Sequence, residues 1–457
     1  MPSQPTSKRV VITGMGWVTP LGDDLERVWQ RLLAGECAIS ALQKFPGSAF
    51  ATNFAAQVGG FDLARFLANT EPHAKAHDHV RYLLGAASQA WKQAGLGDAS
   101  TPGALHSGCA HLDRTRMGVY LGSGEGTVDF ENFAAANVGA YDAESRDIDG
   151  NAWARIAHER FDPRNEIEQE PSIAAQHLAT AFQVEGPSFN AMTACAASTQ
   201  AIGEAFQAIR AGDADAMLAG GSHTMIHALG MTGFIRLTAM STRRDDPATA
   251  SRPFSQSRDG FVMGEGAGVH VVESLDHALA RGATPLAEIV GFGSTADAYR
   301  ITDIDPDGLG AAYAMRAALQ QAGVDPHATD DTGRPFVHYI SAHGTGTQEN
   351  DSIETRAVKE VFADLAPRVP FSSVKSMMGH LIQAAGAVEL VTCVQAIRTA
   401  SVPPTINLHD PDPACDLDYV ANESRDLTDL GGVRMAMSNS FGFGGQNDTL
   451  LLKRYEP

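Results

Sequence analysis

The sequence predicts an α/β protein, in which strands and helices alternate along most of the 457 residues. Three observations support this fold class. Short apolar runs end at glycine, as Val10–Thr13 does at Gly14, and helical periodicities follow them. Glycine supplies 45 residues, above the usual share of about 7%. Such alternation is typical of sheets with mostly parallel strands, and the length allows two domains or one large body.

The first part of the chain contains four regular elements. Residues 23–34 place Leu25, Val28, Trp29 and Leu32 on one helical face. In chain order we expect a strand over Val10–Thr13, helices over 23–34 and 79–94, and a strand over Met117–Leu121.

Two segments interrupt this alternation. Residues 95–115 are rich in Gly, Ser, Ala and His, and residues 138–170 are polar and acidic with little periodicity. We therefore predict insertions near 97–116 and 138–168, the second of which could form a cap.

Regular alternation resumes at Pro187 and continues to the C-terminus. The expected strands are Ser188–Thr193, Ala216–Ala219, Gly268–Glu273, Ala287–Gly291, Phe336–Ala342, Val433–Met437 and Thr449–Lys453, and the expected helices are 196–211, 308–322, 351–363 and 381–398. Strand, glycine-rich turn, helix and strand recur in each half, which hints at duplication. We divide the chain into halves at 8–285 and 286–455.

Charge and composition exclude several classes of function. The net charge of -20 disfavours nucleic acid as the main ligand, because phosphate binding needs clustered Lys and Arg. The five cysteines are odd in number and contain no C-x-x-C, so we expect neither a disulfide framework nor a metal site, and a reducing cytoplasm fits. No apolar run is long enough for a membrane span, and the N-terminus lacks a signal-peptide core.

Cys195 lies where a predicted strand meets an alanine-rich helix. The free N–H groups and positive dipole end of a helix favour thiolate over thiol. A lone free cysteine is more often a buried structural residue. The elbow position and two histidines elsewhere favour a nucleophile here, whereas Cys37, Cys109, Cys393 and Cys415 are interpreted as structural.

Two histidines stand at element ends beside glycine. His343 ends an apolar strand and precedes Gly344-Thr345-Gly346-Thr347, and His380 precedes the helix over 381–398. A helix N-terminus disfavours imidazolium, and a neutral imidazole donates one hydrogen bond. Two such donors aimed at one oxygen could stabilise a developing enolate.

Lys375 lies five residues before His380, and if it is buried it needs a carboxylate partner. Glu354 is the candidate, because it shares a helical face with Val358 and Val361. A local alternative stays open: Asp351 and Glu354 have the spacing of a capping box.

Asn439–Gly445 is interpreted as a glycine-rich turn between the last two strands, where backbone N–H groups can approach a substrate oxygen. A phosphate loop is the rival interpretation, but no Walker Lys-Ser/Thr follows. Gly264–Gly268 precedes a strand rather than opening a helix, so a dinucleotide site is rejected.

These segments together resemble the elongating β-ketoacyl-[acyl carrier protein] synthases of the Cys-His-His type, within the thiolase superfamily. The resemblance runs from Lys8 to Lys453. The matching segments are Val10–Gly16, Gly186–Ser188, Thr193–Ser198, Gly212–Gly221, Ser241–Arg243, Ser251–Phe254, Arg258–Gly268, Ala342–Thr347, Lys375–His380, Pro403–Asn407 and Asn439–Gly445.

The resemblance implies a thiolase-like, five-layered αβαβα fold with two pseudo-symmetric halves, usually as a homodimer. It implies that Cys195 accepts an acyl chain and that His343 and His380 support decarboxylation of a malonyl thioester. The N–H groups of Cys195 and Phe441 would form an oxyanion hole, and Phe441 would also gate the site. Lys375 and Glu354 would set its electrostatics. Thr345 and Thr347 would contact the pantetheine arm of an acyl carrier protein, and no cofactor or metal is implied.

Some residues depart from the family pattern. Glu125 stands where relatives have an apolar residue lining the acyl pocket, and an unpaired carboxylate there costs several kcal/mol. Long saturated chains are therefore disfavoured as substrates. The expected carrier-docking surface has few basic residues, namely Lys75, Arg81, Arg243 and Arg244.

We therefore predict a condensing acyltransferase, specialised for polyketide or unusual acyl chains. The alternative is a non-catalytic chain-length-determining subunit of a heterodimer, but such subunits lack the nucleophile. A degradative thiolase would need a second cysteine near Phe441–Asn447, and the initiating type of synthase replaces one histidine by Asn.

Overall fold

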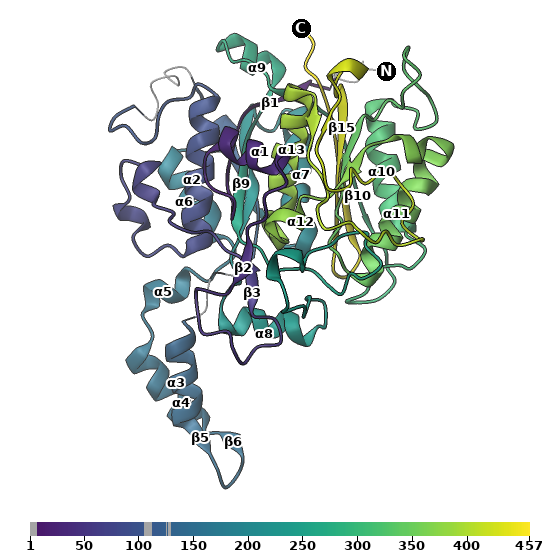
Figure 1. The fold of residues 1–457 in the computed structure, drawn as a ribbon. Coiled ribbons are helices and arrows are strands. Elements are labelled where there is room, and N and C mark those ends of the chain that lie inside the picture. Colours follow the sequence, from purple (N-terminus) through teal and green to yellow (C-terminus); the bar gives the residue numbers. More distant parts are fainter. Residues whose placement is uncertain (1–6, 105–111, 125, 127–128) are drawn as a thin grey trace.

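Ten strands form one continuous sheet in the computed structural model, which describes residues 7–104, 112–124, 126 and 129–457 (Figure 1). Its order is β12-β11-β15-β16-β10-β1-β9-β8-β4-β7. The strands are β1 (Val10–Val18), β4 (Met117–Ser123), β7 (Ser188–Ala191), β8 (Ala216–His223), β9 (Gly266–Ser274), β10 (Ala287–Ala296), β11 (Tyr339–Ser341), β12 (Phe371–Ser372), β15 (Met435–Gly442) and β16 (Gln446–Lys453).

The sheet consists of two halves with the same strand order. When the five strands of each half are numbered in chain order, both halves have the spatial order 3-2-4-5-1 from the outer edge of the sheet to its centre. The first strands of the two halves, β1 and β10, pair with each other at the centre. This repetition confirms the pseudo-symmetric halves, while the boundary at 285 stays a prediction.

The expectation of mostly parallel strands is wrong. Only β12-β11, β11-β15, β8-β4 and β4-β7 are parallel neighbours, and the other five pairings are antiparallel. The fifth strand of each half, β9 or β16, takes part in four of these five pairings, and β1 with β10 is the other. β16, for example, returns from β15 through a tight turn at Phe443–Gly445, and a short connection of this kind joins antiparallel strands.

Helices complete five layers around the two half-sheets. Helices α7 (Ala197–Ala211) and α13 (Ala385–Thr399) pack between the halves, and both contact strands of each half. Helices α2 (Asp78–Gln93) and α6 (Ile173–Phe182) cover the outer face of the first half, and α10 (Leu309–Ala322) and α11 (Gln348–Phe362) belong to the second (Figure 1). The thiolase-like αβαβα arrangement is thus confirmed.

Shorter elements surround this body. They are α1 (Leu25–Leu33), β2 (Ile39–Ala41), β3 (Phe54–Ala56), α8 (Ala228–Arg236), α9 (Leu275–Ala280), α12 (Lys375–Met378), β13 (Ser401–Val402) and β14 (Arg425–Asp426). Across the described ranges, no helix combines the length and apolar character that a membrane crossing requires.

The central helices approach each other closely because small residues face the contact. A Cβ atom on Gly386 of α13 would overlap Thr199 Oγ1 of α7. Ser198 Oγ of α7 also accepts a hydrogen bond from Ala387 N of α13 at 2.9 Å. This contact fixes the start of α7, which carries the predicted nucleophile, relative to the second half.

The polar segment over 138–168 forms most of an arm that extends away from the body (Figure 1). It comprises α3 (Phe130–Ala140), β5 (Tyr141–Asp142), β6 (Asp147–Ile148), α4 (Gly150–Arg160) and α5 (Pro163–Ile167). Aspartates cap its helices: Asp149, for example, accepts from Asn151 N and Ala152 N. The sequence shows little periodicity here because these helices pack mainly on each other and stay largely exposed.

Candidate active site

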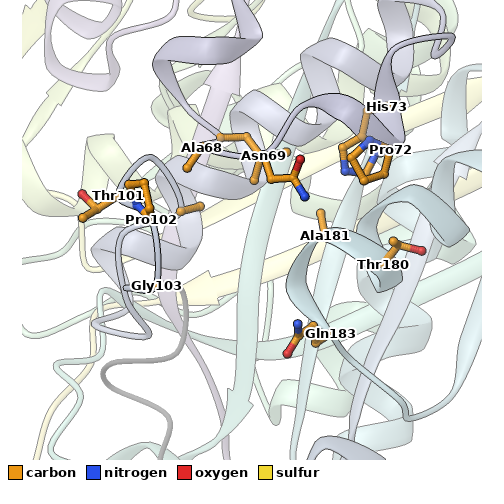
Figure 2. Close-up of a pocket in the computed structure, with 12 residues that line it drawn as sticks. Ala68, Asn69, Pro72, His73, Thr101, Pro102, Gly103, Thr180, Ala181 and Gln183 are labelled. Carbon is orange, nitrogen blue, oxygen red and sulfur yellow. The ribbon is translucent and has the colours of Figure 1, made fainter.

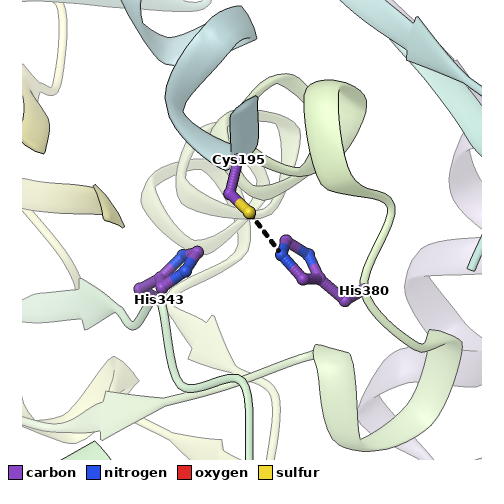
Figure 3. A group of neighbouring side chains, drawn as sticks. All are labelled: Cys195, His343 and His380. Carbon is purple, nitrogen blue, oxygen red and sulfur yellow. Dashed lines mark hydrogen bonds between the residues drawn. The ribbon is translucent and has the colours of Figure 1, made fainter. Parts of the chain in front are cut away.

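The structure brings Cys195, His343 and His380 together, as the sequence predicts. Cys195 lies in a tight helical turn between β7 and α7, His343 follows β11, and His380 follows α12 (Figure 3). One donor atom from each of the three lies within 4.8 Å of the others, and His380 Nε2 is 3.0 Å from Cys195 Sγ. All three side chains are buried.

A strained turn presents the sulfur. Ala194 has a φ of 48°, in the left-handed region that residues with a Cβ seldom occupy. A Cβ on Gly122 of β4 would overlap the backbone of Ala197, so glycine is needed where α7 begins. These constraints hold Cys195 at the edge of the sheet where the parallel strands end.

Hydrogen bonds define the tautomer of His380. Ile382 N donates to His380 Nδ1 at 3.3 Å, so the single proton of a neutral ring lies on Nε2. That Nε2–H points at Cys195 Sγ. The backbone N–H of Phe443 also acts on the sulfur: burial raises the pKa of Cys195, and this N–H lowers it. Two N–H groups therefore converge where negative charge would develop.

The expectation that the helix terminus favours a thiolate is wrong for the resting site. Burial raises the pKa of Cys195 to about 12, although Lys375 and the Phe443 N–H act in the opposite direction. Desolvation outweighs these opposing effects because the side chain is almost completely enclosed. The resting nucleophile is a thiol at neutral pH.

Both imidazoles are neutral. Burial lowers the pKa of His343 and of His380 well below its usual value, and the positive charge of Lys375 lowers both further. Their rings lie 5.4 Å apart between centroids and nearly perpendicular. Neutral rings can donate hydrogen bonds to a substrate oxygen without carrying charge into a dry site.

The partner of Lys375 is Glu389, not Glu354. Lys375 Nζ forms a buried ion pair with Glu389 of α13. The expected pairing with Glu354 fails because α13 lies closer to Lys375, and sequence periodicity cannot rank two carboxylates on different helices. Burial raises the pKa of Glu389 to about 7, against the effect of Lys375.

Glu354 instead holds the loop that carries His343. Its carboxylate accepts from His343 N at 2.9 Å and from Gly344 N at 2.7 Å. The capping-box alternative is also wrong, since Thr347 caps α11 by accepting from Asn350 N. Asp351 accepts from Gly346 N and Phe254 N. Two buried carboxylates therefore fix the backbone around the histidine.

A cleft of about 390 Å³ leads to the three residues. Thr345, Thr347 and Phe441 line it, and the Phe441 ring lies 5.9 Å from the His343 ring. The expected turn over Asn439–Gly445 is shorter than predicted, because β15 continues to Gly442. Glu125 lies outside the described residues, as does Cys109.

Comparison with known proteins places this arrangement in a family. A model of the beta-ketoacyl synthase N-terminal domain matches residues 7–278, and one of the C-terminal domain matches residues 286–409. The chain belongs to the beta-ketoacyl synthase family. It is 40% identical to the 3-oxoacyl-[acyl-carrier-protein] synthase 2 of Coxiella burnetii, covering 98% of this chain and 99% of that one.

Solved structures agree with this assignment. A beta-ketoacyl synthase from Burkholderia phymatum superposes with a TM-score of 0.82 at 33% identity, covering 98% of this chain and 100% of that one. The ishigamide ketosynthase/chain length factor gives 0.81 at 30% identity, with the same coverage. The synthase is accordingly an acyltransferase with a Cys-His-His site, and the non-catalytic alternative is not favoured.

Sequence reasoning about this synthase missed Glu389 and Phe443. Glu389 is the one acidic residue of an otherwise apolar and small stretch, Ala384–Val391, which is a detectable pattern for a buried ion pair. Phe443 lies two residues after Phe441 in the same glycine-rich segment, and only the geometry distinguishes their N–H groups.

A second pocket, of about 460 Å³, lies away from the predicted site residues (Figure 2). It is lined by residues of three segments: Leu67, Ala68, Asn69, Pro72, His73, Ala99, Thr101, Pro102, Gly103, Thr180, Ala181 and Gln183. None of the residues predicted for catalysis lines it.

Proposed function

We propose that this synthase joins an acyl group held on Cys195 to a malonyl group carried by an acyl carrier protein, with release of CO2. The names of the similar synthases support this reaction. The observation that carries the proposal is the buried thiol within reach of two neutral imidazoles at the end of a cleft.

The first half-reaction transfers the acyl group. Cys195 Sγ attacks the thioester carbonyl, the bond to the carrier thiol breaks, and the thiol proton leaves with that carrier. The N–H groups of Cys195 and Phe443 stabilise the oxyanion. Phe443 takes the place first expected for Phe441, because its N–H is the one that lowers the pKa of the Cys195 thiol against the effect of burial.

The second half-reaction forms the carbon–carbon bond. His343 and His380 donate hydrogen bonds to the malonyl thioester oxygen, which accepts the electron pair as the bond to CO2 breaks. The resulting carbanion attacks the acyl-Cys195 carbonyl. The bond to sulfur then breaks, and the thiolate takes up one proton from solvent.

Other predicted residues act around this chemistry. Thr345 and Thr347, whose hydroxyl oxygens are 3.0 Å apart, contact the carrier arm in the cleft, and Phe441 gates it. Lys375 keeps both imidazoles neutral, and Glu354 positions His343. Ser241 and Thr242, which directly precede Arg243 and Arg244, donate hydrogen bonds to Asp259 of the cleft wall. Arg243 and Arg244 therefore offer docking cations to the carrier beside the cleft.

A homodimer is part of the proposal. Among the described strands, β7 pairs only with β4, which leaves one edge of the sheet open. Phe189 and Met192 at this edge are each 53% exposed. Sedimentation of Phe189→Asp beside the unchanged protein tests this edge.

A cytoplasmic location is also proposed, supported by four free cysteines in the described chain, and cell fractionation tests it.

Intact-mass analysis of Cys195→Ala tests the function. The unchanged protein should gain one acyl group from an acyl thioester and should release CO2 when malonyl-carrier protein is added. Cys195→Ala should gain none and should form no condensed product. Full condensation by Cys195→Ala would overturn the proposal.

A further inference from the structure

A row of histidines runs through the interior beside the catalytic cysteine. The histidine row consists of His223, His79, His77, His177 and His73. His223 ends β8, and His79 lies in the first turn of α2. Both side chains are almost fully buried, with 3% and 2% of their surface exposed.

The outer end of the histidine row has its hydrogen bonds satisfied. His177 Nδ1 lies 2.8 Å from His73 Nδ1, and His177 Nε2 lies 3.0 Å from a carboxylate oxygen of Glu168. His73 also lines the second pocket, which lies away from the catalytic residues (Figure 2).

The inner end lacks partners. His223 Nδ1 bonds Gln383 Oε1, but His223 Nε2 and both ring nitrogens of His79 have no hydrogen-bond partner among the described residues. A buried polar atom without a partner costs about 1–3 kcal/mol. Native proteins keep such atoms mainly where a water or a ligand meets them.

The inner end adjoins the nucleophile. Ile382 packs with Cys195 in one apolar cluster, and Gln383, which bonds His223, is the next residue. His223 is close enough to His380 for the two rings to oppose each other's protonation: burial lowers the pKa of His380 most, and His223 adds to this effect. A Cβ on Gly124 would overlap the Gln383 amide, so Gly124 packs directly against the residue that bonds His223.

The geometry of the reaction directs the acyl chain toward this end. Both thioesters must approach through the cleft lined by Thr345 and Thr347. The malonyl thioester therefore needs the cleft empty while the acyl chain stays on Cys195. The chain must therefore extend from the sulfur outside this cleft, and Ile382 packs with Cys195 without lining the cleft.

A neutral imidazole offers one donor and one acceptor, which match a hydroxyl or keto oxygen. Burial keeps both rings neutral, since it lowers the pKa of His79 and of His223 to about 3. We propose that His223, Gln383 and His79 select acyl chains that carry a hydroxyl or keto oxygen beyond the thioester. This inference rests on the proposed condensing function.

Competition between matched substrates tests the proposal. The purified synthase is given carrier-bound octanoyl groups that are saturated or carry one hydroxyl or keto oxygen at successive positions. Loading on Cys195 is followed by intact mass, and condensation by product formation. One hydrogen bond of about 1–1.5 kcal/mol predicts a preference of about tenfold for the best oxygenated chain.

Variants locate the source of that preference. His79→Leu and His223→Leu should each lower kcat/KM for the oxygenated chain and raise it for the saturated chain, while His79→Gln should keep much of the preference. His270→Leu is the matched control, because His270 is equally buried but lies mid-strand in β9. Thermal melting identifies any variant that fails to fold.

Three outcomes would overturn the inference. In the first, the unchanged protein prefers the saturated chain. In the second, His79→Leu and His223→Leu both keep the preference for the oxygenated chain. In the third, His270→Leu changes that preference as much as they do. Failure of the unchanged protein to condense any chain would instead contradict the proposed function.

Discussion

At the residue scale, burial determines the chemistry of the site more than local dipoles do. Cys195 begins a helix and receives two N–H groups, yet enclosure keeps its proton on the sulfur. The same enclosure keeps His343 and His380 neutral. A dry site thus holds a neutral thiol and two neutral donors, and charge appears only as bonds rearrange.

The raised pKa of Cys195 predicts its reactivity with iodoacetamide. The thiolate is the reactive form, and its fraction grows about tenfold per pH unit below the pKa. We expect the alkylation rate to rise in this way from pH 7 to 9 without a plateau, measured by mass spectrometry of the labelled peptide. A plateau already reached at pH 7 would show a thiolate and contradict the assignment.

Removing the charge of Lys375 should change the pH profile. Lys375→Met takes away the cation that lowers the pKa of both histidines, so their pKa values rise. The imidazoles then become charged at higher pH, and the acidic limb of kcat/KM against pH should move upward. An acidic limb that stays in place would show that burial alone keeps them neutral.

The control for Lys375 concerns stability. Breaking a buried pair by removing one partner costs about 3–5 kcal/mol. Lys375→Met with Glu389→Leu should recover most of that loss in urea unfolding but not the pH profile. Recovery of both would assign the pair a purely structural role.

The sequence contains enough information to find the three reacting side chains, because each stands at an element end among small residues. It could not select Glu389 over Glu354, since that choice depends on where the tertiary fold places α13 and α11 relative to Lys375. It also could not show that burial would overrule the helix terminus at Cys195.

At the element scale, the contact between α7 and α13 couples the two halves. Gly386 leaves room for Thr199 Oγ1, which itself lies 2.6 Å from Ser440 Oγ of β15. Cys195 lies two residues before α7, and His380 lies five residues before α13, so a shift between the helices changes the distance between sulfur and ring.

Gly386→Ala should therefore damage both stability and activity. Overpacking a tight interior contact costs about 1–3 kcal/mol. We expect a lower midpoint in urea and a larger fractional loss of kcat than of acyl loading. Ala387→Gly, at the next position, is the comparison: it should destabilise α13 without forcing the helices apart. Equal kcat losses in both variants would contradict the packing argument.

Sequence patterns located most elements to within a few residues, since buried runs and glycine stops are local features. They placed the end of β15 too early because Asn439–Gly442 contains Asn and glycine, yet pairs fully with β16. Tertiary pairing overrides local preference at this strand.

At the scale of the whole molecule, the arm is separate from the layers that build the site. Its helices pack on each other, with Trp153 against Phe161 at 6.0 Å and Trp153 Nε1 donating to Asn137 Oδ1. The sequence indicated an insertion here from its polarity but not a helical hairpin, because mutual packing of short helices leaves a weak periodicity.

Replacing residues 130–160 with a short glycine-serine linker should leave the body folded. We expect the thermal midpoint to change by only a few degrees and acyl loading of Cys195 to persist, since the arm contributes little to the central layers. Collapse of the circular dichroism spectrum after the replacement would show that the arm supports the body.

The nucleophile comes from one half of the sheet and both imidazoles come from the other, so Cys195 and His343 lie far apart along the chain. The activity of the catalytic centre therefore depends on how closely the two halves fit together. A small displacement at the contact between the two halves would stop turnover while every strand remained paired. Heat, mild denaturant or an ill-fitting substitution far from the cleft would abolish activity before spectroscopy registered any loss of shape.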